Sequence, residues 1–166
     1  MDLRAFQKQS IRLLVLFNLT LLVVSWAMML RAYPQLPQEI PYWLNLAGQE
    51  ILRTPKSPFL FIYPVAQSLF LIVFWLAGSV WVRKPDRPAE KPELQAALTD
   101  LKKELVLLFM IFFNLIFIHI QRSLIWLARG AGAGVNKFYF FSLIIIILLL
   151  FPYYRFRRTL IMKLSR

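Results

Sequence analysis

Residues 105–121 read LVLLFMIFFNLIFIHIQ and carry no charge between Glu104 and Arg122. About 20 apolar residues in a helix span a hydrocarbon core of roughly 30 Å. Similar uncharged runs occur in residues 13–30, 57–82 and 138–154. Because backbone N–H and C=O groups in lipid need hydrogen-bond partners within the protein, each run predicts a helix. The sequence therefore predicts an all-α polytopic integral membrane protein with four transmembrane helices.

The composition agrees, because 59% hydrophobic residues would leave a soluble domain of 166 residues with too much apolar surface. We expect a single membrane domain over residues 1–166, in which the first run is a retained helix and not a signal peptide. Its predicted parts are helices at about 11–31, 59–82, 104–128 and 136–154, an outer loop 32–58, a cytoplasmic loop 83–103 and a basic tail 155–166.

The distribution of Lys and Arg predicts how the chain is threaded. Of the 20 Lys and Arg residues, 14 lie before the first run, between the second and third runs, and after the fourth run, and 6 lie in the other two loops or at their edges. Loops rich in Lys and Arg stay in the cytoplasm. Both termini and the loop 83–103 are therefore predicted to be cytoplasmic, in a multi-pass membrane protein.

Several function classes are poorly compatible with this sequence. The chain has no cysteine and one histidine, His119, which excludes disulfides, thiolate metal sites and a two-histidine haem site within one copy. We therefore expect no metal and no cofactor. The formal charge of +12 lies beside the predicted spans, which favours anionic lipid headgroups over nucleic acid as partners. Neither a carboxylate pair nor a nucleophile with its base is evident, so we do not expect an enzyme.

Polar side chains inside the predicted spans are costly in lipid and should face the bundle interior. In the third span they are Asn114, His119, Gln121 and Arg122, and in the first two they are Asn18, Thr20, Gln67 and Ser68. For His119 three roles stay open: a structural hydrogen bond, a ligand contact, or proton coupling. We expect Arg122 to reach the outer headgroups or to pair with an acid of a partner.

Two basic, amphipathic segments flank the spans on the cytoplasmic side. Leu94, Leu98, Leu101 and Leu105 recur at helical spacing and predict a helix that runs into the third span, either as its surface extension or as a grip for a partner. The tail alternates apolar residues with cations and is expected to lie on anionic headgroups or to dock a specific partner. Its candidate contacts are Arg155, Arg157, Arg158, Lys163 and Arg166.

The outer loop is the least generic part of the chain. Proline fixes φ and removes a donor, so Pro34 and Pro37 predict an extended first half. Pro41 is suited to the first position of a short interfacial helix closed by Gly48. The candidate ligand-binding or partner-binding residues of this loop are Ile40, Pro41, Tyr42, Trp43, Asn45, Gly48 and Lys56.

This loop resembles the membrane domain found at the N-terminus of SdpI-like bacterial immunity proteins. The matching positions are Leu36-Pro37, Ile40-Pro41, Asn45, Gly48 and Lys56, with Pro64 in the following helix. The sequence departs from the pattern at Trp43, where the family has histidine, and at Glu50-Ile51, where it has Pro-Asp. The resemblance implies a multi-helix bacterial inner-membrane protein and, in some relatives, protection from a membrane-active toxin or sensing linked to a regulator.

Two hypotheses of function follow. The first is a noncatalytic SdpI-like protein whose outer loop binds a ligand or toxin, in a protective or sensing role. The second is a structural accessory subunit whose apolar helix faces and basic tail bind other membrane protein subunits.

Overall fold

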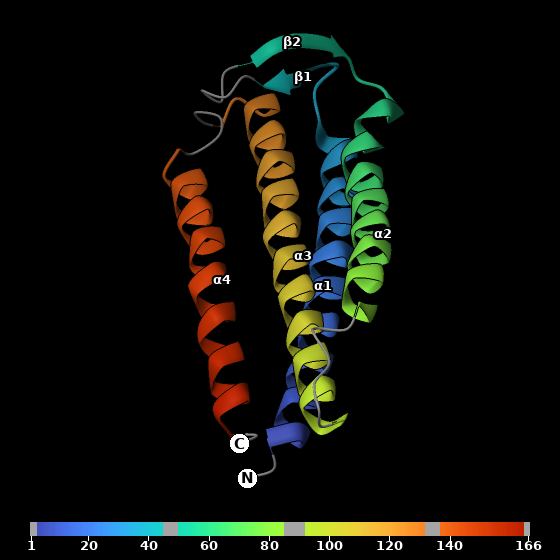
Figure 1. The fold of residues 1–166 in the computed structure, drawn as a ribbon. Coiled ribbons are helices and arrows are strands. Elements are labelled where there is room, and N and C mark those ends of the chain that lie inside the picture. The colour runs from blue at the N-terminus through green and yellow to red at the C-terminus, as the bar shows by residue number, and fades with distance from the viewer. Residues whose placement is uncertain (1–2, 45–49, 85–91, 132–136, 165–166) are drawn as a thin grey trace.

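The computed structural model describes residues 3–44, 50–84, 92–131 and 137–164. Its long helices stand roughly side by side, and the strands lie across one end of the molecule, which we call the hairpin end (Figure 1). The start of α1 and the end of α4 lie at the other, which we call the terminal end. The described elements are α1 (Leu3–Ala32), η1 (Tyr33–Gln35), β1 (Glu39–Leu44), β2 (Glu50–Pro55), η2 (Pro58–Phe61), α2 (Ile62–Arg83), α3 (Pro92–Ala128) and α4 (Lys137–Leu164).

The four expected helices are all present. Among the described residues, three segments are long and apolar enough to cross a membrane, namely Gln7–Gln35, Pro58–Arg83 and Pro92–Ala128. This finding supports the predicted class of helical membrane protein. The predicted helix before the third apolar run is also confirmed, because α3 begins at Pro92 and runs without a break into that run.

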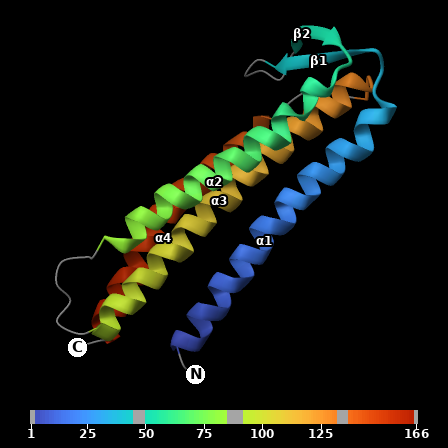
Figure 2. The ribbon, with the colours of Figure 1, turned by 90° about the vertical axis from the view of Figure 1, so that its right-hand side faces the viewer.

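Helix α3 is the central element. It contacts α1, α2, α4 and strand β1, whereas α1 and α2 contact each other less. In the first view α3 lies between α4 and the pair formed by α1 and α2 (Figure 1). In the second view α1 diverges from α2 toward the terminal end (Figure 2). The bundle is therefore organised around one long helix.

The ends of α3 follow ordinary capping chemistry. Proline is favoured in a first helical turn, and Glu93 beside Pro92 places a negative charge near the positive end of the helix dipole. At the other end Gly130 has φ 67°, a left-handed conformation in which a Cβ would be strained. Ala131 N donates to Trp126 O and Gly130 N donates to Leu127 O, at 3.0 Å each. These are the two bonds of a Schellman C-cap, which ends the helix sharply.

Helix α4 is longer than expected. It continues past Pro152 to Leu164, so most of the predicted tail belongs to the same helix. Proline inside a helix removes one backbone donor, yet the following turns stay helical and carry exposed Arg155 and Arg158.

The prediction of an interfacial helix that begins at Pro41 is wrong, because Pro41 lies in strand β1. Residues 39–44 and 50–55 form an antiparallel hairpin, in which Glu39 pairs with Pro55 and Ile40 with Thr54. A residue before proline is biased toward extended conformations, so Ile40 favours a strand. A helix of two turns would also have gained little from its own hydrogen bonds. Pro41 is tolerated because a two-stranded sheet consists only of edge strands.

Two hydrophobic clusters lie along the bundle. The outer cluster, at the hairpin end, joins α1, α3 and the strands through Met29, Ala32, Leu36, Ile40, Leu60 and Ile125. The inner cluster joins α2 and α3 through Leu71, Val106, Leu107 and Met110. Each cluster therefore holds α3 against its neighbours at a different depth.

Most of the remaining apolar surface faces outward. Val23, Val73 and Leu148 are each more than 60% exposed, as expected for side chains that contact lipid. Trp75 belongs to this group at 56% exposure, beside exposed Ile72 and Leu76 on α2.

Gly78 sets the distance between α2 and α3. A Cβ at this position would lie 2.6 Å from Val106 Cγ1, which is closer than packed carbon atoms approach. We predict that Gly78→Val destabilises the purified protein by about 1–3 kcal/mol through overpacking. Thermal unfolding in detergent measures this change.

The compensating variant is the control. Val106→Ala in the Gly78→Val background should recover part of the lost stability, because it removes the two methyl groups nearest the new side chain. A double variant no more stable than Gly78→Val alone would contradict this account of the contact.

Candidate functional site

The outer hairpin packs on the ends of helices α1 and α3. Ile40 is 2% exposed and lies in the outer cluster beside Met29, Leu60 and Ile125. Pro41 is also fully buried. Ile40 therefore anchors strand β1 to the end of α3, and both candidate ligand residues are withdrawn from the surface.

Lys56 fixes the segment before the hairpin. Its Nζ donates to Pro34 O at 3.1 Å and to Leu36 O at 3.0 Å, and it lies 5.2 Å from the centre of the Tyr33 ring. Its backbone N also donates to Gln38 O. The predicted site residue Lys56 thus uses its ammonium group to bind backbone carbonyls of the proline-rich segment, in which Pro34 and Pro37 have no N–H.

The outward face of the hairpin exposes apolar side chains of β2 beside an ion pair. Ile51 is 61% exposed and Leu52 is 51% exposed. Arg53 pairs with Glu50 at 2.9 Å, and the hydrogen bond and charge of that carboxylate raise the pKa of Arg53 above its ordinary value. This face therefore offers apolar contacts beside a largely self-neutralised pair.

The remaining outer-loop candidates cannot be placed. Strand β1 includes the backbone of Tyr42 and Trp43, but their side chains lie outside the described part of the structure. Asn45 and Gly48 lie outside the described residues altogether.

A network of uncharged polar side chains occupies the middle of the bundle, between the outer and inner clusters. Its members, from α1, α2 and α3, are Asn18, Ser25, Gln67, Asn114 and Gln121, and each is less than 5% exposed. We call these residues the amide network. Because its members neither ionise at physiological pH nor act as strong nucleophiles, the network is suited to joining helices and not to moving protons.

The hydrogen bonds of the amide network run continuously from one helix to the next. Asn114 Nδ2 donates to Asn18 Oδ1 at 2.9 Å, and Gln67 Nε2 donates to Asn114 Oδ1 at 2.5 Å. Gln121 Nε2 donates to Gln67 Oε1 at 3.1 Å and to Ser25 Oγ at 2.7 Å. Asn18 also donates to the backbone O of Leu107 at 3.1 Å. Three helices are therefore held in one register.

The sequence predicted most of this network. Asn18, Gln67, Asn114 and Gln121 face the interior as expected, and Trp26 Nε1 bonds to Ser68 Oγ at 3.1 Å. Thr20 is exposed and bonds only to its own helix at Leu16 O. Sequence reasoning missed Ser25, although it follows Asn18 by two helical turns on the same face.

His119 and Arg122 lie near the hairpin end of α3 and contact aromatic rings. The His119 ring stacks on Tyr139 of α4 with 4.0 Å between centroids, and Tyr139 Oη donates to Leu115 O at 3.1 Å. Arg122 is exposed, and its guanidinium lies 4.0 Å from the centre of the Trp126 ring. The exposure of Arg122 contradicts the expectation that it faces the interior, and it is compatible with the expectation that its side chain reaches toward the outer headgroups.

A second cluster, at the terminal end, was not anticipated. The side chain of Glu104 is 8% exposed, accepts from Tyr153 Oη at 2.7 Å and pairs with Arg157 at 3.3 Å. Arg157, predicted to contact lipid headgroups, thus points at α3. Nearby, Lys102 Nζ donates to Lys84 O at 2.8 Å. Sequence reasoning could have found this cluster from Glu104, a carboxylate at the start of an apolar run. A carboxylate that is buried at such a position requires a cationic partner.

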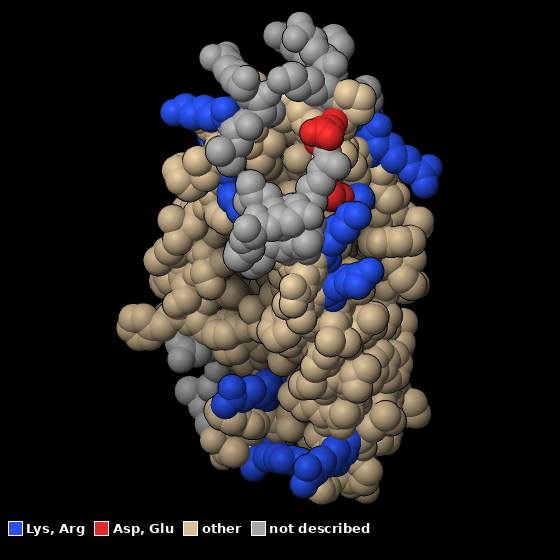
Figure 3. Space-filling view, turned by 90° about the horizontal axis from the view of Figure 1, so that it is seen from below, with Lys and Arg blue, Asp and Glu red and all other residues tan. Residues whose placement is uncertain are grey.

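The other tail cations remain at the surface. Arg155, Arg158 and Lys163 are exposed, and Arg166 lies outside the described residues. Seen from the terminal end, Lys and Arg side chains are spread around the rim of the molecule and outnumber the acids (Figure 3). Within the described ranges, no group of three His, Cys, Asp or Glu is placed to hold a metal ion.

None of the known family models, curated proteins and solved structures matches this chain. The SdpI-like resemblance of the outer loop therefore stays a prediction.

The amide network predicts a specific loss on mutation. Gln67→Leu removes the acceptor shared by Ser25 and Gln121 and the donor to Asn114, leaving buried polar groups without these partners. We expect destabilisation of about 1–3 kcal/mol by thermal unfolding in detergent. Thr20→Val, at an exposed position on α1, is the control and should change stability by less than about 0.5 kcal/mol. Equal effects of the two variants would contradict the assignment.

The Glu104 cluster predicts how α4 is held. Glu104→Ala leaves Arg157 and Tyr153 without their carboxylate, and we expect a loss of about 3 kcal/mol, as is typical when one partner of a buried ion pair is removed. Asp100→Ala removes an ion pair to Lys103 on the surface of the same helix and should cost less than about 1 kcal/mol. Thermal unfolding of both variants decides whether α4 depends on this cluster.

Proposed function

We propose that this chain is a noncatalytic membrane protein that binds its ligand through the outer hairpin, in an SdpI-like protective or sensing role. The supporting observation is the fastening of the hairpin onto the bundle by Ile40, Pro41 and Lys56. A loop that only connected two helices would not need such anchoring. Anchoring reduces the conformational entropy that a ligand must overcome on binding.

The proposed orientation places the hairpin outside a bacterial cytoplasmic membrane. In it α4 is a fourth span, and both ends of the chain lie in the cytoplasm. The strongest support is the excess of Lys and Arg in residues 1–12, 83–103 and 155–166, whose described parts lie at the end of the molecule opposite the hairpin. The exposed apolar residues along α4, such as Ile145 and Leu149, are suited to contact with lipid.

The ligand class follows from the outward face of the hairpin. Ile51 and Leu52 are exposed, apolar and close to the predicted membrane surface, beside the Glu50–Arg53 pair. Such a surface complements the apolar side of an amphipathic peptide that lies in the interface. A membrane-active peptide is therefore the ligand class that we propose.

The test replaces the apolar face. Bacteria that produce the protein are challenged with a panel of amphipathic, membrane-permeabilising peptides, and survival is compared between wild type and the double variant Ile51→Asp with Leu52→Asp. We expect wild type to raise the lethal concentration of at least one peptide and the double variant to lose most of this protection. Binding of the same fluorescently labelled peptide to the purified protein in lipid nanodiscs should fall in parallel.

The matched control is Ile51→Val with Leu52→Val, which keeps an apolar, β-branched face and should retain protection. All variants are first shown to insert and to unfold at the wild-type temperature. Unchanged protection by the aspartate variant, or no protection by wild type, would contradict the proposed role.

A second candidate, a structural accessory subunit, is favoured by the position of α4. This helix packs mainly on α3 and leaves a broad apolar face exposed, including Phe141, Ile145 and Phe151. The mass of the native protein extracted in mild detergent separates the two functions. Stoichiometric companion chains would favour the accessory role, and a lone chain would favour the hairpin as the functional surface.

A further inference from the structure

A groove separates α1 from α2 at the terminal end of the bundle. Its first hollow, about 370 Å³, lies between Val15 of α1, Trp75 and Gly78 of α2, and Val106 of α3. A second hollow of about 280 Å³ adjoins it and shares Val15 and Trp75. Because the two hollows share these residues, they form one groove. Space remains between α1 and α2 because α1 packs more extensively on α3 than on α2.

The depth of this groove matches one leaflet of a bilayer. On α1 the lining residues run from Ile11 in the first hollow to Leu22 in the second. With a helix rise of about 1.5 Å per residue, these positions lie roughly 16 Å apart along the axis, about half of a hydrocarbon core of roughly 30 Å. An extended acyl chain entering at the headgroup level would thus run along the groove to the bilayer midplane.

Two cations stand at the mouth of the groove. Arg83 and Lys103 line the first hollow, from the end of α2 and the first half of α3, and both are exposed. Lys103 also pairs with Asp100 at 2.9 Å, but an exposed pair on one helix is weak and leaves the ammonium able to donate elsewhere. A guanidinium beside an ammonium complements a phosphate group.

We propose that this groove binds one anionic glycerophospholipid of the inner leaflet. Arg83 and Lys103 hold its phosphate, and an acyl chain lies against Val15, Trp75 and Leu107. The site is separate from the hairpin, so it does not depend on the identity of the outer ligand. By filling the space between α1 and α2, the lipid would complete the packing of the bundle at the terminal end.

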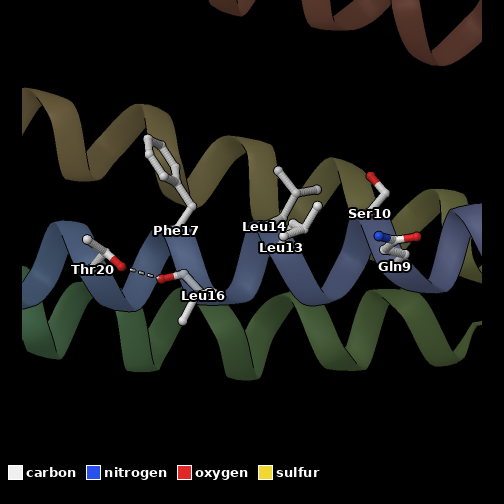
Figure 4. A pocket seen from close by; sticks show the side chains of 7 residues that line it. All are labelled: Gln9, Ser10, Leu13, Leu14, Leu16, Phe17 and Thr20. Carbon is white, nitrogen blue, oxygen red and sulfur yellow. Dashed lines mark hydrogen bonds between the residues drawn. The ribbon is translucent and has the colours of Figure 1, made fainter.

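Another hollow, on helix α1, provides a comparison within the same molecule. It has a volume of about 600 Å³, and all its lining residues come from α1, among them Leu13, Phe17 and Thr20 (Figure 4). None of the described lining side chains is charged. This larger surface is expected to contact acyl chains without selecting their headgroups, so volume alone does not carry the proposal.

Native mass spectrometry of the full chain in mild detergent tests the proposal. Dioleoyl phosphatidylglycerol and dioleoyl phosphatidylcholine are titrated separately, and the apparent dissociation constants of the first bound lipid are compared. We expect wild type to prefer the anionic lipid. Arg83→Gln with Lys103→Gln should reduce that preference by roughly fivefold per cation.

The control with the same change of charge is Lys8→Gln with Arg12→Gln, two exposed positions on α1 that line neither hollow. It should change the preference by less than about twofold. An equal loss in both double variants would overturn the proposal, because the lipid would then be attracted by overall charge. A wild-type protein without preference for the anionic lipid would overturn it as well.

A second pair of variants tests the acyl-chain part of the site. Val15→Trp fills the shared wall of the two hollows and should weaken binding of both lipids, whereas Val23→Trp, at a 65% exposed position on α1, should not. Soluble glycerophosphoglycerol should fail to displace the lipid, and displacement would identify a simple phosphate site instead. Unchanged lipid binding in Val15→Trp, or a companion polypeptide that excludes lipid, would also contradict the proposal.

Discussion

The amide network at the centre of the bundle is the interaction on which the rest of the structure depends. In a membrane, apolar side chains gain little by leaving lipid for protein, so apolar packing selects weakly among helix registers. Hydrogen bonds between buried amides are directional, and those of Asn114, Gln67 and Gln121 are satisfied together in one arrangement. The network therefore sets how α1, α2 and α3 lie against one another.

The position of the hairpin follows from that arrangement of α1, α2 and α3. Met29 and Ile125 follow the network residues Ser25 and Gln121 by one turn on α1 and α3, and together with Leu60 they form the floor on which Ile40 lies. At the other end the same helices diverge, which leaves the groove between α1 and α2. One buried constraint thus accounts for both surfaces: a fixed platform at the hairpin end and an open groove at the terminal end.

Uncharged runs were sufficient to predict the helices, because length and hydrophobicity control insertion. Buried amides were predictable because polar groups avoid lipid, and this rule found Asn18 and Gln67. It failed for Arg122 because a long side chain reaches the surface from the same stretch of helix.

The hairpin was missed because strand pairing depends on residues far apart in the sequence, here Ile40 and Thr54. Burial of Glu104 depended on Tyr153 and Arg157 of another helix, which no local pattern reveals.

The central claim is that the hairpin lies outside the membrane while the ends of α2 and α4 lie in the cytoplasm. The chain has no native cysteine, so single cysteines can be placed at Leu52, Lys84 and Lys163 and treated with a membrane-impermeant maleimide in intact cells. The account predicts that Leu52→Cys is labelled at once, and that Lys84→Cys and Lys163→Cys are labelled only after the cells are permeabilised. Labelling of Lys163→Cys from outside, or protection of Leu52→Cys, would contradict it.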